Sequence, residues 1–306
     1  MMIFVLMAGV AQAAEVLDIG YGARSIGLGR TFAGQKDDAY GIFGNPASLK
    51  GLTTGEIVSM YGQMGADISY SMLGYVMPTK HGKFFAGYGN NVLSGFTSTT
   101  IDASTGRPVP VSAFDFRSDL FMTGYQNSLT NDISYGMRLK YFTKGAGTGY
   151  YGNGINADAG LLIVPNNRLS LGIEARNILL GTMGALKLSN GQTEEQPFQV
   201  DLGLGFWVQP RIGLFADYSL YKSIPNEARL GVEWRASDIL SVRMGAEQKS
   251  SDLNSSYING SAGVGLNLGL LRIDYAYHYD SLLVSNSRHF VSISINTPKI
   301  TAPEAE

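Results

Sequence analysis

Most of the chain consists of segments in which apolar and polar residues alternate. Residues 229–235 read Arg-Leu-Gly-Val-Glu-Trp-Arg, and residues 271–278 read Leu-Arg-Ile-Asp-Tyr-Ala-Tyr-His. Successive side chains of a β-strand point to opposite faces, so a period of two is the strand period. The pattern therefore predicts strands with one apolar face and one face that is polar or small.

Fourteen such strands can be placed along the chain, and an even number is typical of bacterial membrane barrels. The predicted spans are 55–63, 69–78, 82–91, 115–127, 132–143, 153–164, 168–176, 198–208, 211–221, 227–235, 239–248, 257–268, 270–280 and 287–296.

The connections between these strands form two classes. Every even-numbered connection is short, whereas the two long ones, 92–114 and 177–197, are the third and the seventh. Long loops therefore lie on one rim and tight turns on the other, as in outer-membrane barrels with short periplasmic turns. This predicts an all-β fold, a 14-stranded antiparallel transmembrane β-barrel with both chain ends on the periplasmic side. A soluble β-sandwich or propeller is the alternative, but the second face is too charged to pack against another sheet.

Composition narrows the function classes. The 306 residues include 39 Gly, 17 Tyr and 14 Phe, and only 16% are charged, which is unlike a disordered chain. A net charge of −2 argues against a nucleic-acid binder. The absence of Cys excludes disulfides and thiolate metal sites, and three His leave little room for a His-rich metal site. We therefore expect no cofactor and no metal.

The N-terminus predicts export. Residues 3–10 are apolar, and Ala11-Gln12-Ala13 fits the small-x-small pattern of a signal-peptide cleavage site; a disordered or buried apolar N-terminus is the alternative. No later stretch approaches the ~18 apolar residues of a membrane-spanning helix. The predicted organisation, in the bacterial outer membrane, is a signal peptide (1–13), an N-terminal periplasmic plug segment (14–54), the barrel (55–296) and a polar C-terminal tail (297–306).

The polar faces of the strands carry both charge signs in similar numbers. An ion-selective pore tends to line its constriction with one sign, so we expect ion pairs that hold the wall together. Inward glycines such as Gly172 and Gly203 leave space that the N-terminal segment can fill. The same alternation places Arg117 and Asp119 inward. The candidate lumen charges are Arg138, Lys140, Asp158, Glu174, Arg176, Asp201, Asp217, Arg229, Glu233, Arg235, Arg243, Glu247, Arg272 and Asp274.

The N-terminal segment does not alternate. Asp37 is positioned to cap a short helix through Ile42, and Pro46 to start a new turn. A nucleotide-binding loop is a poor interpretation, because the Gly run follows no strand and lacks a Gly-Lys-Ser/Thr ending. The segment contains four short motifs in this order: Gly27-Leu28-Gly29-Arg30, Phe32-Ala33-Gly34, Asp37-Asp38-Ala39 and Asn45-Pro46-Ala47.

These motifs and their order resemble the N-terminal signature of the long-chain fatty-acid transporter (FadL) superfamily, particularly its shorter PorV/PorQ branch. The stretch 177–181, followed by Pro197 and a Gly-rich strand, is also similar to that branch. The resemblance implies a 14-stranded barrel whose N-terminal segment plugs the lumen from the periplasmic side. It further implies that this hatch is formed by Gly27, Gly29, Arg30, Asp37, Asp38, Asn45, Pro46 and Ala47.

The two long connections are shorter than those of fatty-acid transporters, but they carry apolar residues. We expect these residues either to contact an apolar ligand or partner, or to pack on the rim. They are Phe96, Val109 and Val111 in the first connection, and Leu179, Leu180, Met183 and Leu186 in the second.

Two functions fit this sequence. The first is a FadL-like channel for small hydrophobic compounds, with Gly87 and Gly89 as weak points where the wall could open. The alternative is a PorV/PorQ-like adaptor of protein secretion or surface attachment, of the type IX secretion type, whose loops dock other proteins. The predicted partners are outer-membrane lipid, and either a small hydrophobic ligand or secreted and surface proteins. We expect no nucleic acid and a monomeric barrel.

An enzyme is not expected. His278 lies near Asp274 and Asp280 in sequence, as a wall-mounted hydrolase would require, but nothing in the sequence fixes a catalytic geometry. A lone His on a barrel wall is more often a structural residue.

Overall fold

The computed structural model describes residues 16–64, 67–147, 149–222, 225–250, 256–281 and 288–297. The predicted signal peptide and all but the first residue of the predicted C-terminal tail lie outside these residues.

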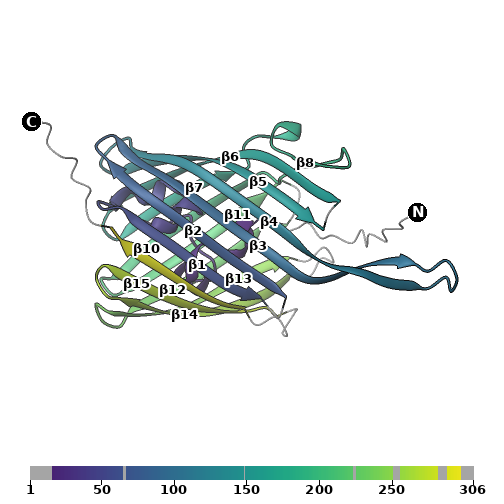
Figure 1. The fold of residues 1–306 in the computed structure, drawn as a ribbon. Helices are drawn as coiled ribbons and strands as arrows, with labels where there is room; N and C mark the ends of the chain where they lie inside the picture. Colours follow the sequence, from purple (N-terminus) through teal and green to yellow (C-terminus); the bar gives the residue numbers. More distant parts are fainter. Residues whose placement is uncertain are drawn as a thin grey trace, which may run out of the picture.

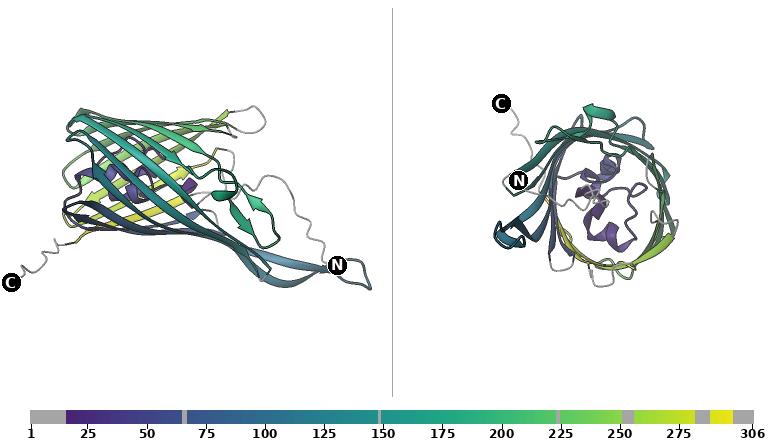
Figure 2. Two further views of the ribbon diagram at one scale, coloured as in Figure 1. Left: turned by 90° about the horizontal axis from the view of Figure 1, so that it is seen from above. Right: turned by 90° about the vertical axis from the view of Figure 1, so that its right-hand side faces the viewer.

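Fourteen antiparallel strands close into a barrel (Figures 1 and 2). Neighbours along the chain pair with each other, β7 pairs with β10, and β1 pairs with β16 to complete the wall. The strands are β1 (Glu56–Met64), β2 (Ile68–Thr79), β3 (Gly82–Ile101), β4 (Pro108–Ser128), β5 (Ile133–Ala146), β6 (Tyr150–Asn166), β7 (Leu169–Arg176), β10 (Gln199–Gln209), β11 (Ile212–Tyr221), β12 (Glu227–Arg235), β13 (Leu240–Ser250), β14 (Ser256–Asn267), β15 (Leu271–Tyr279) and β16 (Arg288–Asn296).

The first long connection is a hairpin rather than a loop. β3 and β4 stay paired well beyond their neighbours. The pairing of β2 with β3 goes no further than Ile68 opposite Leu93, and that of β5 with β4 no further than Ala146 opposite Phe116. The paired residues 94–115 form an arm that projects from the rim (Figure 2). The prediction of a loop over 92–114 was therefore wrong. Its Ser, Thr and Val residues suit a two-stranded ribbon, which turns at Gly106 with a φ of 67°.

The second long connection carries short elements. It contains the 3₁₀ turn η4 (Gly181–Met183) and the strands β8 (Leu186–Leu188) and β9 (Thr193–Glu194). β8 pairs with β6 at Gly152 and Asn153, beyond the point where the short strand β7 has ended.

The outer face of the barrel is apolar. Leu230, Val232 and Met244 are 62%, 44% and 67% exposed, and they belong to the apolar positions of the alternating pattern. Among the described residues, no helix is both long and apolar enough to cross a membrane.

Residues 16–52, named here the inner segment, lie inside the barrel (Figure 2, right). They form η1 (Val16–Ile19), α1 (Gly22–Gly27), η2 (Ala39–Ile42) and η3 (Pro46–Gly51). Asp38, not Asp37, caps η2 by accepting a hydrogen bond from the Tyr40 N–H, because Asp37 has a φ of 57° and points away. Pro46 starts η3 as predicted, and the Asn45 side chain caps it.

The interior has two unlike halves. Along β1–β4 most inward side chains are apolar and form one core with the inner segment; along β5–β7 and β10–β15 the inward positions hold the buried charges, together with other polar residues and glycines. The wall residues of the apolar half are Val58, Met60, Met64, Tyr70, Met72, Val76, Phe85, Leu120 and Met122.

Candidate functional site: the interior and the mouth of the barrel

Wall glycines let the backbone of the inner segment touch the barrel. A Cβ on Gly172 would lie 1.7 Å from the carbonyl oxygen of Ala33, and one on Gly203 would lie 2.1 Å from the Gly34 nitrogen. A Cβ on Gly245 would lie 2.0 Å from the Gly29 nitrogen. The backbones of the inner segment and of the wall strands therefore approach to a distance that only glycine allows.

The glycines of β3 serve the same packing. A Cβ on Gly87 would lie 2.8 Å from Ile42, and one on Gly89 would lie 2.8 Å from Val16. β3 keeps its pairing with β2 and β4 at both positions, and its register shifts only beyond Leu93. The structure therefore shows no gap in the wall at Gly87 and Gly89.

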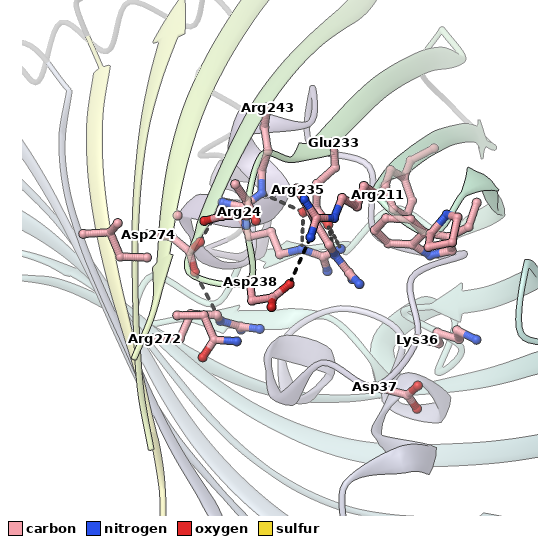
Figure 3. A pocket seen from close by; sticks show the side chains of 18 of the residues that line it. Arg24, Lys36, Asp37, Arg211, Glu233, Arg235, Asp238, Arg243, Arg272 and Asp274 are labelled. Atoms are coloured by element: carbon pink, nitrogen blue, oxygen red, sulfur yellow. Dashed lines mark hydrogen bonds and ion pairs between the residues drawn. The ribbon is translucent and has the colours of Figure 1, made fainter. Parts of the chain in front are cut away.

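Six side chains form a closed ring of alternating charge, named here the ion ring; Figure 3 labels all of its members except Asp38. Arg24 and Asp38 come from the inner segment, and the other members come from β12, β13 and β15. Going round, the links are Arg24–Glu233 at 2.8 Å, Glu233–Arg243 at 2.7 Å, Arg243–Asp274 at 2.6 Å, Asp274–Arg272 at 3.2 Å, Arg272–Asp38 at 3.2 Å and Asp38–Arg24 at 3.0 Å.

The ion ring keeps Asp38 ionised. Burial alone would raise the pKa of this carboxyl, but the Arg272 and Arg24 guanidinium groups and the Tyr40 N–H lower it below its usual range. The ionised Asp38 in turn pairs with both arginines, at 3.0 Å for Arg24 and 3.2 Å for Arg272.

A second network lies on the opposite wall. Arg138 pairs with Asp158 at 2.5 Å and with Glu174 at 2.8 Å, and Lys140 also contacts Asp158 at 3.0 Å. The remaining guanidinium nitrogen of Arg138 donates to the carbonyls of Ile42 and Gly44. Arg138 on the wall thus binds carbonyls at the C-terminal end of η2 that have no partner within the helix.

Further contacts distribute the attachment around the barrel. Arg30 pairs with Glu247 at 2.7 Å, and Glu247 also meets Arg229 at 3.3 Å. Asp217 accepts hydrogen bonds from the N–H groups of Phe32 and Ala33, at 2.6 and 2.9 Å.

Two more predicted lumen charges, Asp201 and Arg176, are buried nearby. Asp201 lies 3.9 Å from Arg229, and Arg176 lies 3.4 Å from Asp18 of the inner segment. Most predicted lumen charges are thus buried, and nearly all of them contact another charge of the wall or the inner segment.

Tyr40 bridges the two ends of the barrel sheet. Its hydroxyl lies 2.8 Å from the Ser59 carbonyl on β1 and 3.2 Å from the Ile293 carbonyl on β16. Ser59 and Ile293 face each other across the β1–β16 pairing. The inner segment therefore touches both sides of the line along which the first and last strands meet.

The residues implied as a hatch all lie in the inner segment, in varied roles. Gly29 and Arg30 have positive φ values of 70° and 64°, and a Cβ on Gly27 would lie 3.1 Å from the Gly263 backbone. Asp37 is exposed at the short-turn rim. Pro46 packs on Gly136, and the Ala47 carbonyl accepts a hydrogen bond from Ser134.

Two charges point the other way from the prediction. Arg117 and Asp119 lie on the outer face with Tyr88 and Asn90, where Asp119 accepts hydrogen bonds from all three side chains. The inward residues of β4 at this point are Leu120 and Met122, which are buried. The prediction that Arg117 and Asp119 point inward was therefore wrong. Alternation did not show which face is which, because both faces of β4 mix polar and apolar residues.

The predicted apolar loop residues lie in two separate places. Phe96 stacks on Phe114 in the arm, where Val109 and Val111 are exposed. In the second connection Leu180 and Met183 are exposed, Leu179 is half-buried, and Leu186 is buried near Gly152 of β6.

His278 has no hydrogen-bond partner on either ring nitrogen and is 3% exposed. In the part of the chain that the structure describes, no group of three or more His, Asp or Glu side chains could hold a metal ion. The geometry around His278 is thus not that of a nucleophile–base pair.

Three contact residues were not predicted: Arg24, Tyr40 and the η1 residue Asp18. Arg24 lies three residues before the start of the Gly-Leu-Gly-Arg motif, and a lone cation among small and apolar residues is the signal that could have found it.

A cavity of about 500 Å³ opens at the short-turn end of the barrel, named here the mouth (Figure 3). Ion-ring residues form its inner side. Lys36 and Asp37 of the inner segment, and Arg211, Arg235 and Asp238 at the turns, line its rim, as do the apolar residues Trp207, Pro210, Phe215 and Leu266.

No protein-family model matches the sequence, and no curated protein matches it. Solved structures do resemble it in fold. A mutant of the TodX monoaromatic hydrocarbon channel (deltaS2S3) is 15% identical, with a TM-score of 0.70 over 91% of this chain and 99% of that chain. The toluene transporter TbuX of Ralstonia pickettii is 14% identical (TM-score 0.65; 91% and 99% covered), and a FadL homologue of Pseudomonas aeruginosa is 12% identical (TM-score 0.60; 90% and 98% covered). At these identities the likeness establishes a FadL-type barrel fold.

Proposed function

We propose that this protein is an outer-membrane channel for small hydrophobic compounds. The observation that carries the proposal is the combination of a closed barrel, an apolar outer face and a chain segment inside the lumen, in the fold of hydrocarbon channels. A non-enzymatic role is supported by the structural neighbours, which are transport channels. The inner segment is the hatch of this channel.

The two-sided attachment of the hatch supports a selective rather than an open pore. Ion pairs hold it to β12, β13 and β15, and Arg138 of β5 donates hydrogen bonds to its carbonyls, while an apolar core holds it to β1–β4. A hydrophilic solute would have to replace the buried ion pairs, whereas an apolar compound can move along the apolar half without breaking them.

Uptake into intact cells tests the proposal. Labelled toluene is offered to Gram-negative cells whose lipopolysaccharide outer leaflet slows its entry, with and without the expressed protein. We expect initial uptake to rise several-fold, while entry of a hydrophilic dye stays unchanged. Equal toluene uptake in both strains would contradict the channel, and faster dye entry would indicate an open pore instead.

Assignment to the PorV/PorQ branch, with an adaptor function in secretion, stays a prediction. The arm is the element that such an adaptor would use. Co-purification of a surface or secreted protein with the wild type, and its loss when the arm is shortened, would favour that function.

A further inference from the structure

The mouth has more positive than negative charge. Six cationic side chains line it, against the four carboxylates of Asp37, Glu233, Asp238 and Asp274, although the whole chain has a net charge of −2. A local surplus of this kind draws anions to a cleft whose walls are low in dielectric constant.

The surplus of cationic side chains is greatest around the carboxylate of Glu233. This carboxylate is shared by Arg24 at 2.8 Å, Arg243 at 2.7 Å and Arg235 at 3.5 Å. Asp274 and Asp38 are each shared by two arginines of the ion ring. Four guanidinium groups therefore share three carboxylates, and Arg235 has the longest contact.

Arg235 is positioned to accept a further anion. Its guanidinium lies 3.9 Å from the centre of the Trp207 ring, which fixes the side chain, and the side chain is 49% exposed. Arg211, on the same rim, meets Asp238 only at 3.5 Å, and Asp238 is itself 98% exposed. Arginine is well suited to planar, bidentate recognition of a carboxylate.

Apolar surface lies directly beside these cations. The Trp207 and Phe215 rings meet edge to face with centres 5.9 Å apart, and Pro210 and Leu266 also line the cavity. A volume of about 500 Å³ is within the range of small-molecule sites.

We propose that the mouth is a binding site for a small carboxylate attached to an apolar, flat body, such as an aromatic carboxylate. Arg235 and Arg211 bind the carboxylate, and Trp207 and Phe215 contact the apolar body. This site goes beyond the proposed channel function, because binding there does not require transport.

Titration of the purified full-length protein in detergent tests the site, with benzoate, toluene and inorganic phosphate as probes at constant ionic strength. The chain has two Trp, and Trp234 is on the outer face, so Trp234→Phe leaves Trp207 as the reporter. We expect a saturable change in Trp207 fluorescence with benzoate, and at least tenfold weaker binding of toluene and phosphate. Calorimetry on the same samples reports binding independently of the fluorophore.

Arg235→Gln and Arg168→Gln form a matched pair, because Arg168 lies on the same rim but does not line the cavity. Arg235→Gln should weaken benzoate binding at least tenfold, and Arg168→Gln less than twofold. Absence of saturable benzoate binding, equal effects of the two variants, or phosphate binding as tight as benzoate would each overturn the proposal. Heat-modifiable gel mobility shows that each variant is folded. Benzoate binding without toluene uptake in cells would count only against the channel.

Discussion

Along β1–β4 the inner segment packs against Met, Phe, Tyr and Val side chains, whereas along β12–β15 it meets Arg, Glu and Asp. Apolar contacts are non-directional and scale with buried area, so they favour burial without fixing one position. The ion ring is directional, because each charge needs a partner at hydrogen-bonding distance. We infer that the apolar half supplies most of the burial and the charged half fixes the register of the segment.

Removing one charge should have the largest effect. Glu233→Gln leaves three arginines beside a neutral amide, and breaking a buried ion pair in this way costs about 3–5 kcal/mol. We expect this loss in urea unfolding of the barrel in lipid vesicles, followed by gel mobility. The exposed Glu195→Gln is the control and should change stability by less than about 0.5 kcal/mol. Equal stability of both variants would contradict a structural role for the ion ring.

A cavity in the apolar half should cost somewhat less. Ile42 is fully buried against β2 and β3, and Ile42→Ala should destabilise by about 3 kcal/mol. The cost should be the same at about 0.1 M and about 1 M salt, because no charge is involved. A salt-dependent cost measured in the same unfolding assay would show that the two halves are not independent.

The outer face offers a smaller effect. Val232 is exposed on the same strand as Glu233 but points outward, and Val232→Arg should cost about 2 kcal/mol, at the lower end of the range for a lipid-facing position. Val232→Leu should be neutral. If Val232→Arg folds as well in vesicles as the wild type, the assignment of this face to lipid fails.

The arm should contribute least to the stability of the barrel. Its residues lie beyond the last pairing with β2 and β5, so replacing residues 97–112 by Asn-Gly should leave the urea midpoint unchanged. A loss above about 1 kcal/mol would mean that the arm is part of the folding unit.

The strands could be predicted from sequence wherever the two faces differ in polarity. β12 was predicted at its observed bounds, and β7, β11 and β16 within one residue. Alternation failed along β1–β4, where Val58, Met72 and Phe85 are apolar residues on an inward face that was expected to be polar. From the sequence of a strand with two apolar faces, one cannot predict that its lumen side packs against another part of the chain.

The pairing of charges could not be predicted to the same degree. The equal numbers of basic and acidic residues indicated ion pairs, but the ion ring depends on three wall strands and on where α1 and η2 lie. Arg24 and Asp38 are 14 residues apart and meet only after the inner segment has folded back on itself. The arm was missed because its Ser, Thr, Pro and Gly residues are also typical of loops.

The contact of Tyr40 with β1 and β16 has a consequence for assembly. These two strands are the first and last of the barrel, so their pairing is the final step of closure if the strands are added in chain order. Tyr40 precedes both of them in the chain, and it reaches carbonyls on each side of the closing line. We infer that the inner segment is in place before the wall is complete, and that Tyr40 then helps to align the last strand with the first.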